Sequence, residues 1–403
     1  MSTNNDQTVL VLNCGSSSLK FAIINPHSGQ QFLSGLAEAL TLPEAQISWR
    51  FGDDGEKQKA MLASGADHTA ALTFLEENVL HSQKGLLDSL IAVGHRIVHG
   101  GELFSAPVLI DDSVEAGVEK CIPLAPLHNP AHLLGIRAAR RLFANLPHVA
   151  VFDTAFHQTM PPAAYRYALP EEMYSKHAVR RYGMHGTSHY FVANEAAELL
   201  GKPVSDTNVI TAHLGNGASV CAVKGGRSVD TSMGMTPLDG LMMGTRCGSI
   251  DPSIVFYMVD ELGYSLDRVK DVFNKQSGLL GVSGKTSDFR GITQGVEEGD
   301  ENAKLAFDMF CYRLAKFIAS YYVTLGRVDA LIFTGGIGEN SLMMRSRVLE
   351  LLAPFGFVED KQGNEAARFG QGGLITKPDA AKAYVIPTNE ELVIAQGAAS
   401  FAN

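Results

Sequence analysis

VLVLNCGSSSLKFAII, residues 9–24, decides the fold of this chain, because VITAHLGNGASVCAV at residues 209–223 repeats its pattern. Aligned on Gly15 and Gly215, each stretch has a β-rich run, a tight turn of Gly, Ser and Asn residues, and a second β-rich run. The pattern predicts a hairpin whose turn exposes backbone N–H groups and small polar side chains, which suit phosphate oxygens. Two such turns in matching register predict a duplicated domain that holds a polyphosphate between the copies.

Length and composition indicate an ordinary globular protein. The chain has 403 residues, of which 45% are hydrophobic and 19% charged, so two or three domains are expected. A net charge of −10 argues against nucleic acid or an anionic membrane as the main partner. The amino terminus, MSTNNDQ, shows no secretory signal, and the most apolar helical run, residues 303–325, is too charged to span a bilayer.

The cysteine pattern fits a cytoplasmic protein. Five cysteines are scattered along the chain without a CxxC pair: Cys14, Cys121, Cys221, Cys247 and Cys311. An odd number of scattered cysteines fits reduced thiols better than a disulfide framework or a zinc site.

Strand and helix patterns alternate, which indicates an α/β architecture. Beyond the two hairpins, short apolar strands are expected at 90–93, 148–152 and 330–334, and helices at 130–143, 265–275, 300–325 and 341–352. Low-complexity linkers are absent from the sequence, so we expect the halves to pack closely with a cleft between them. The chain is expected to cross between the halves near residues 167–182.

Three glycine-bearing turns follow apolar strands, at residues 13–18, 213–217 and 335–340. Glycine lets the backbone approach a phosphate closely, and the third turn, GGIGEN, is expected to be a loop that opens the 341–352 helix, whose N-terminus favours an anion. Two better-known nucleotide motifs fail on spacing. GLLGVSGKTS has Leu279 where a P-loop needs glycine, and GGIGEN has Ser341 where a GxGxxG motif needs its third glycine.

Arginines and histidines in glycine-flanked loops are candidates for binding anions. Arg96 in GHRIVHGG and Arg246 in MMGTRCG have few other charges nearby, and Arg290 in SDFRG is a third candidate. The planar fork of arginine suits carboxylate and phosphate, although a lone arginine is often only solvated or salt-bridged.

Three loop histidines, His128, His185 and His213, are candidate donors to an anionic transition state or, equally, structural hydrogen-bonding groups. The pairs His95/His99 and His185/His189 have the i,i+4 spacing of a helical zinc motif. Zinc is disfavoured because Glu is missing from the second position and because neighbouring glycines argue against a helix at either pair.

Two carboxylates stand where a ligand could use them. Asp153 ends the apolar strand HVAVF, and the carboxyl ends of α/β strands face the usual ligand crevice. Asp153 could hold Mg²⁺ through water, position a nucleophile, or simply cap a turn. Glu390 in PTNEEL is a second candidate oxygen ligand, since Mg²⁺ takes one or two carboxylates together with phosphate oxygens.

Several longer stretches carry a family resemblance: NCGSSSLK, GHRIVHGG, PLAPLHNP, FDTAFHQTMP, RRYGMHGTSH, HLGNGAS, DTSMGMTPLDGLMMGTRCG, SDFRG and FTGGIGEN. In this order they resemble the acetate kinase family, and they cover nearly the whole chain. The resemblance implies the superfamily of acetate and sugar kinases, heat-shock cognate ATPases and actin. It implies two RNase H-like domains, at 1–154 with 390–403 and at 155–389, with an active-site cleft between them.

The resemblance also implies residue roles. The catalytic centre would comprise Asn13, Arg96, Asp153, His185 and Arg246. Arg96 would also bind the substrate carboxylate, and the remaining substrate-pocket residues would be Val98, Leu127, His128 and Pro237. Nucleotide would be bound by Lys20, His213, Gly215, Asn216, Gly217, Asp288, Phe289, Arg290, Gly336, Ile337, Gly338 and Asn340. Asn13 and Glu390 would place Mg²⁺, for which Mn²⁺ could substitute.

By the same resemblance the chain would be a homodimer that transfers the γ-phosphoryl group of ATP directly to acetate, in organic acid metabolism that leads to acetyl-CoA. One departure is Met184, where the family usually has Phe, so the shape of the substrate pocket is open. Val98 fills space that an extra methylene would need, which favours acetate over propionate. A propionate kinase remains the alternative, and an ATP-dependent binding module of the same superfamily is a remote one.

Overall fold

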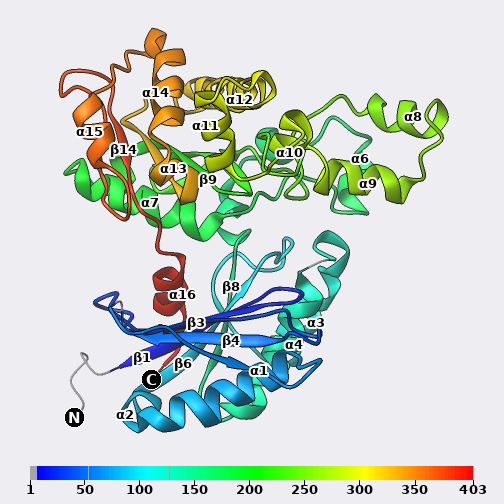
Figure 1. The fold of residues 1–403 in the computed structure, drawn as a ribbon, viewed down its shortest axis with the longest axis vertical. Helices are drawn as coiled ribbons and strands as arrows, with labels where there is room; N and C mark the ends of the chain where they lie inside the picture. The colour runs from blue at the N-terminus through cyan, green and yellow to red at the C-terminus, as the bar shows by residue number, and fades with distance from the viewer. Residues whose placement is uncertain (1–6, 53, 127, 403) are drawn as a thin grey trace. The chain divides into compact units, whose positions relative to one another are not determined.

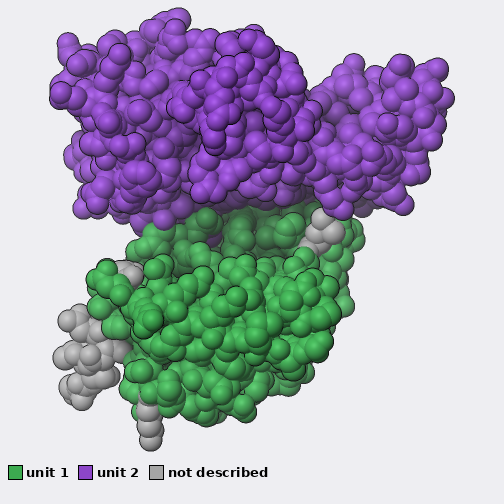
Figure 2. All heavy atoms as spheres, viewed as in Figure 1, with its two compact units in different colours: residues 1–156, 389–403 green, residues 157–388 purple. Residues whose placement is uncertain are grey.

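The computed structural model describes residues 7–52, 54–126 and 128–402. The chain forms two compact units, residues 1–156 with 389–403 and residues 157–388 (Figure 2). From the family resemblance the divisions were expected after residues 154 and 389. The separate expectation of a crossing near residues 167–182 is wrong. That segment belongs to the second unit, where the Arg180 guanidinium stacks 3.7 Å from the centre of the Tyr165 ring.

The first unit is built on an eight-stranded sheet in the order β5-β4-β3-β2-β1-β6-β8-β7 (Figure 1). β1 pairs antiparallel with β2 and parallel with β6, which in turn pairs parallel with β8. The strands are β1 (Thr8–Cys14), β2 (Leu19–Ile24), β3 (Gln31–Glu38), β4 (Gln46–Phe51), β5 (Gln58–Met61), β6 (Leu90–Ile97), β7 (Val108–Leu109) and β8 (His148–Phe152).

Helices cover both faces of this sheet, which explains why β1 is apolar throughout rather than alternating. Leu10 and Leu12 pack on the side of α1 and α4, whereas Val9 and Val11 pack on the side of α16. The helices are α1 (His68–Phe74), α2 (Lys84–Asp88), α3 (Asp112–Lys120), α4 (Asn129–Leu142) and α16 (Glu390–Ala399), with a π-helix at Leu75–Leu80 and 3₁₀ turns at His81–Gln83, Ile122–Leu124 and Ala155–Thr159.

The second unit repeats the topology of the first. Its sheet runs β11-β10-β9-β12-β14-β13, the same order as β3-β2-β1-β6-β8-β7, and each neighbouring pair has the same parallel or antiparallel sense. The strands are β9 (Asn208–Leu214), β10 (Ala218–Lys224), β11 (Arg227–Thr231), β12 (Ala330–Thr334), β13 (Gly373–Leu374) and β14 (Ala383–Val385). The duplication predicted from Gly15 and Gly215 is therefore confirmed, with a second turn that is one residue shorter: Gly15 N–H bonds to Ser18 O, but Gly215 N–H to Gly217 O.

Helices surround the second sheet as well. Ile210, Ala212 and Leu214 of β9 face a core that contains Phe310 and Leu314 of the long helix α12. The helices are α5 (Pro162–Tyr165), α6 (Glu171–Ser175), α7 (Gly186–Leu199), α8 (Ser253–Asp260), α9 (Leu266–Lys275), α10 (Gly278–Ser283), α11 (Phe289–Glu297), α12 (Glu301–Leu325), α13 (Gly335–Asn340), α14 (Leu342–Leu351) and α15 (Lys361–Ala366), with 3₁₀ turns at Val204–Asp206 and Ala353–Phe355.

The predicted strands and longer helices are confirmed, but several local expectations are wrong. Arg96 and His213, expected in loops, lie within strands β6 and β9. GGIGEN is not an open loop: residues 335–340 form the short helix α13, which ends before Ser341 caps α14. His185 and His189 do lie at a helix. His185 is the N-cap of α7, and Gly186 is tolerated because it stands at the first helical position. Across the described ranges, we find no helix both long and apolar enough to cross a bilayer.

Candidate active site

In the first unit, three sequence-predicted residues meet because three parallel strands end together. Asn13 stands near the end of β1, Arg96 near the end of β6, and Asp153 directly after β8. The strand registers align these ends, since Leu12 pairs with His95 and Arg96 pairs with Val151. The carboxyl ends of parallel strands are the usual ligand-binding edge of an α/β sheet.

Arg96 and Asp153 form a two-point ion pair at this edge. Arg96 Nε donates to Asp153 Oδ1 at 3.2 Å, and Nη2 donates to Oδ2 at 2.5 Å. Burial, the largest single influence, would lower the pKa of Arg96, but the negative charges of Asp153, Glu390 and Glu391 and the hydrogen bond to Asp153 together raise that pKa above its ordinary value. The fork of Arg96 is thus oriented by a carboxylate that is 1% exposed, and Arg96 Nη1 also donates to Asn13 Oδ1 at 3.3 Å.

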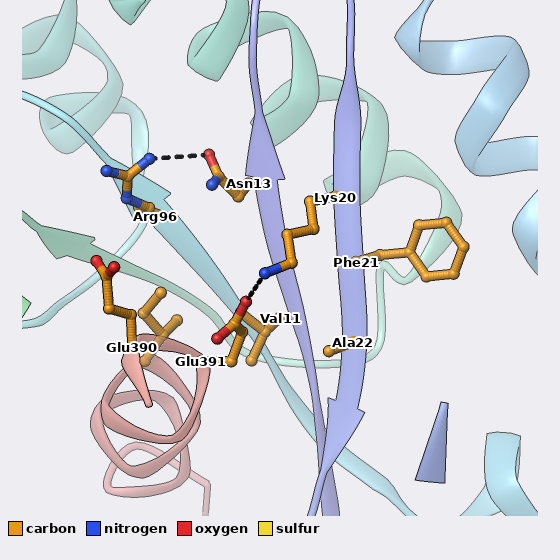
Figure 3. A pocket seen from close by; sticks show the side chains of 9 residues that line it. Val11, Asn13, Lys20, Phe21, Ala22, Arg96, Glu390 and Glu391 are labelled. Carbon is orange, nitrogen blue, oxygen red and sulfur yellow. Dashed lines mark hydrogen bonds and ion pairs between the residues drawn. The ribbon is translucent and has the colours of Figure 1, made fainter. Parts of the chain in front are cut away.

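Glu390 reaches the same edge from the carboxy-terminal helix α16. The helix lies close to β6 because Gly94 has no side chain: a Cβ there would stand 2.8 Å from Ile394 Cγ2. Glu390 is in the first turn of α16, and its negative charge also raises the pKa of Arg96. Glu390, Arg96 and Asn13 line one pocket of about 130 Å³, and their side chains are drawn in Figure 3.

Lys20 lines this pocket too, on β2 opposite Asn13, and forms an ion pair with Glu391 (Figure 3). It was expected among the nucleotide-binding residues. The structure places it in the first unit, whereas the other expected nucleotide-binding residues belong to the second.

In the second unit, the 215–217 turn packs closely against the loop that carries Arg246. Gly244 N–H donates to Asn216 O at 3.0 Å, and a Cβ on Gly244 would meet Asn216 Oδ1 at 2.0 Å. A Cβ built on Gly217 would lie 3.5 Å from both Arg246 Nη1 and His185 Nε2. Arg246 and His185 therefore both border the backbone of this turn.

Contacts with neighbouring residues fix the position of each of these two side chains. Arg246 Nη1 donates to Pro237 O at 3.3 Å, and burial lowers the pKa of Arg246 from its ordinary value. His185 has a φ of 59°, in the left-handed region that non-glycine residues rarely adopt. Such strain persists only where surrounding contacts fix it. Here His185 Nδ1 lies 2.9 Å from Ser219 Oγ, and the centre of the His185 ring lies 4.3 Å from that of His213, with the two rings tilted by 32°.

The remaining nucleotide candidates lie at the start of α11 and within the short helix α13. Asp288 caps α11 by accepting from Arg290 N–H, and it also pairs with the Arg290 guanidinium at 2.6 Å, so this arginine has a local partner. Helix α13 is held in place by the fully buried Arg345, which donates to Gly338 O at 2.9 Å and to Glu339 O at 2.7 Å. Arg345 was not among the residues expected from the sequence, where its only signal is an arginine within an apolar helical pattern.

Comparisons with known proteins agree with this arrangement. The sequence profile of the acetokinase family matches residues 8–396. The chain belongs to the acetokinase family. It is 59% identical over 398 residues to an acetate kinase of Shewanella sp. strain W3-18-1, with 99% of both chains covered.

Two solved structures similar to this chain share its fold. A propionate kinase from Francisella tularensis has 47% identity and a TM-score of 0.92, with 98% of this chain and 99% of that one covered. Porphyromonas gingivalis acetate kinase has 44% identity and a TM-score of 0.93, with 98% and 100% covered. The chain is accordingly an α/β protein with two mixed sheets in the actin-like ATPase fold, and an ATP-using kinase with a carboxyl group as acceptor.

For this acetokinase family member, the structure describes all the residues expected in the substrate pocket except Leu127. Val98 is 7% exposed and follows β6, and its N–H donates to His132 Nε2 at 3.3 Å. His128 is the N-cap of α4 and is half-buried. Pro237 lies in the second unit, and Leu127 lies outside the described residues. Met184 is 3% exposed and packs in the core of the second unit.

The oxygen donors at the first-unit edge fit a hard cation. Within the described ranges, no group of three His, Cys, Asp or Glu side chains is arranged to hold a metal. Glu390 contributes a carboxylate to the pocket that Asn13 and Arg96 also line, and a carboxylate is the kind of ligand that Mg²⁺ takes. Mg²⁺ needs no more than one or two carboxylates when phosphate oxygens and water complete its shell.

Proposed function

We propose that this chain transfers the γ-phosphoryl group of ATP reversibly and directly to acetate, giving acetyl phosphate and ADP. The observation that carries the proposal is the Arg96–Asp153 pair at the carboxyl ends of the strands. Asp153 holds the guanidinium of Arg96 in place, and a guanidinium is suited to binding a second carboxylate, that of the substrate. The 59% identity to an acetate kinase, over 99% of both chains, supports acetate as the acceptor substrate.

The reaction needs alignment and charge neutralisation more than proton transfer. A carboxylate is already ionised at neutral pH, so no general base is required, but two anions must be brought together. Arg96 in the first unit and Arg246 with His185 in the second are the groups that we propose neutralise them. Arg96 would orient the acceptor, and Arg246 and His185 would stabilise charge on the transferring group.

We propose that nucleotide binds to the second unit, over the 215–217 turn, the start of α11 and helix α13. Glycines in the turn and in α13 let backbone N–H groups approach phosphates. Glu390, with Asn13 beside it, would hold Mg²⁺ or Mn²⁺, and the cation would offset the negative charge of the phosphates. We further propose that the two units close on substrate, since phosphoryl transfer must exclude water.

We also propose that the protein is a homodimer and that it is located in the cytoplasm. α8 and the residues that follow it expose large apolar side chains, among them Phe256 at 66% and Tyr257 at 58%, which supports a homodimer that covers them. All five cysteines are free thiols, which fits the reducing cytoplasm. Light scattering of the purified chain tests the dimer directly, and a monomer at micromolar concentration would contradict it.

Hydroxylamine trapping tests the activity. The full chain is incubated with ATP, Mg²⁺ and either acetate, propionate or butyrate, and the hydroxamate formed from each acyl phosphate is measured. We expect the highest turnover with acetate. Highest turnover with propionate would keep the mechanism and favour the alternative substrate. ATP binding without any hydroxamate would favour an ATP-dependent binding module instead.

A further inference from the structure

Polar side chains gather on one face of the second sheet, between β9, β10 and α7. The even positions of β9 face the core beneath α12, so its odd positions, Thr211 and His213, face the opposite side. Ser219 stands opposite His213 in the β9–β10 register and shares that face. The first turns of α7 bring Ser188 and His189 against them, at three and four residues after His185.

One chain of hydrogen bonds leads through this layer to His185. Thr211 Oγ1 lies 2.7 Å from His189 Nδ1, His189 Nε2 lies 2.8 Å from Ser219 Oγ, and Ser219 Oγ lies 2.9 Å from His185 Nδ1. Burial, with His157 and His213 nearby, holds the pKa of His189 well below 6.5. His189 is therefore neutral and has a single ring hydrogen to share between its two hydroxyl neighbours.

Counting hydrogens fixes the direction of this chain. If Thr211 donates to His189, then His189 Nε2–H donates to Ser219, and the Ser219 hydroxyl donates to His185 Nδ1. Every buried hydrogen then has an acceptor. In the reverse direction the Thr211 hydroxyl hydrogen has no acceptor within the described residues, although Thr211 is fully buried. An unmet buried donor is unfavourable, so the forward direction is preferred.

A second chain, built from other residues, reaches His213 in the same sense. Thr388 Oγ1 donates to Ser188 Oγ at 2.8 Å, so the hydrogen of Ser188 is available for His213 Nδ1, which lies 2.8 Å away. Both histidines thus accept a serine hydroxyl at Nδ1. A neutral imidazole that accepts at Nδ1 carries its hydrogen on Nε2.

We propose that these two hydroxyl chains hold His185 and His213 as neutral Nε2–H tautomers, so that each presents a hydrogen-bond donor without first binding a proton. His185 Nε2 borders the Gly217 turn beside Arg246, where the proposed function places the phosphoryl group. Resting on that proposed function, Ser219, His189 and Thr211 are positioning residues: they act on the reaction only through the ring of His185.

Nitrogen NMR of the full chain labelled with [¹⁵N]histidine tests the tautomers without requiring activity. His185→Gln and His213→Gln variants assign the signals. We expect an unprotonated, hydrogen-bonded Nδ1 and a protonated Nε2 for both residues at pH 7.5. Ser219→Ala should shift the Nδ1 signal of His185 and leave that of His213 in place, and Ser188→Ala should do the reverse. A protonated Nδ1 on His185 in the unmodified protein overturns the proposal.

Kinetics tests the consequence for the reaction. Ser219→Ala should lower kcat by about 10-fold or more, the effect of one lost hydrogen bond on a transition state, while KM for acetate and ATP changes less than about 3-fold. Thr211→Val removes the first donor at nearly constant shape and should also lower kcat, whereas Thr211→Ser keeps the hydroxyl and should restore it. Unchanged kcat in Ser219→Ala contradicts the proposal. Absence of acyl phosphate from the unmodified protein would refute the proposed function and leave the NMR result standing.

Discussion

Arg96 and Asp153 are joined by two parallel hydrogen bonds, Nε to Oδ1 at 3.2 Å and Nη2 to Oδ2 at 2.5 Å, although they stand 57 residues apart in the chain. This is bidentate binding of a carboxylate by a guanidinium, and Nη1 of Arg96 donates instead to Asn13 Oδ1. Asp153 is thus positioned to set the direction in which Arg96 points.

Asp153→Asn keeps the shape of the side chain but removes the charge that orients Arg96. We expect kcat for acyl phosphate formation to fall at least about 100-fold, because a displacement of about 1 Å in a positioning group has effects of this size. Asp112→Asn is the matched control, since Asp112 pairs with Arg140 in the same unit but is fully exposed. Equal activity of the two variants would remove Asp153 from the centre.

Arg246→Ala should affect kcat far more than KM for ATP. The guanidinium borders the Gly217 turn and is held by Pro237 O, a placement suited to charge that develops during transfer rather than to nucleotide affinity. Steady-state kinetics with saturating acetate measures both constants. Arg268→Ala, on the exposed side of α9, is the control. A near-normal kcat for Arg246→Ala would move this residue out of the reaction.

How far the sequence predicts these sites depends on how local the signal is. The strand pattern placed Asp153 at the ligand-binding edge of a sheet, because this residue ends an apolar run. The grouping of Asn13 and Arg96 with Asp153 came from the family resemblance. The role of His189 and Ser219 could not be predicted in the same way. His189 was assigned outside a helix because Gly186 precedes it, yet glycine is harmless at the first helical position. A better signal was available in the polar Thr211 and His213 at alternate positions of an otherwise apolar strand.

Val98→Ala should widen the space for the acceptor and shift preference toward propionate. A single methylene accounts for about 1–3 kcal/mol of discrimination, so we expect the propionate-to-acetate ratio of kcat/KM to rise by about 10-fold. The Val98 N–H bond to His132 is unaffected by shortening the side chain. Val204→Ala, at an exposed position of the second unit, controls for general loss of valine methyls. An unchanged ratio would show that Val98 does not line the acceptor pocket.

Arg345→Met should destabilise the second unit and weaken ATP binding. The buried guanidinium satisfies carbonyls of Gly338, Glu339, Asn364 and Ala367 at once, and methionine can satisfy none of them. Each unmet buried carbonyl costs about 1–3 kcal/mol, so a loss of at least about 3 kcal/mol in unfolding free energy is expected. Urea unfolding measures it, and KM for ATP should rise because α13 loses its support. Arg347→Met, more exposed on the same helix, should do neither.

Acid should destabilise the protein over a pH range that is determined by its buried histidines. Burial lowers the pKa of His148 and of His157 from 6.5 to about 4, and that of His132 to about 3. Below pH 6.5 the unfolded chain therefore binds protons that the folded chain does not, and stability must fall as the pH drops toward 4. Each such histidine contributes a slope of up to about 1.4 kcal/mol per pH unit.

His148 is the sharpest single test of this slope. Its Nδ1 lies 3.0 Å from His95 Nε2, and its Nε2 lies 3.2 Å from Phe143 O, so protonation at Nδ1 would remove an acceptor that His95 needs. We expect His148→Gln to lower stability at pH 7.5 but to flatten its dependence on pH between 6.5 and 4.5. His27→Gln, at an exposed turn, should leave the slope as it is. Urea unfolding at half-unit pH steps measures both, and an unchanged slope in His148→Gln would mean that other groups cause the acid sensitivity.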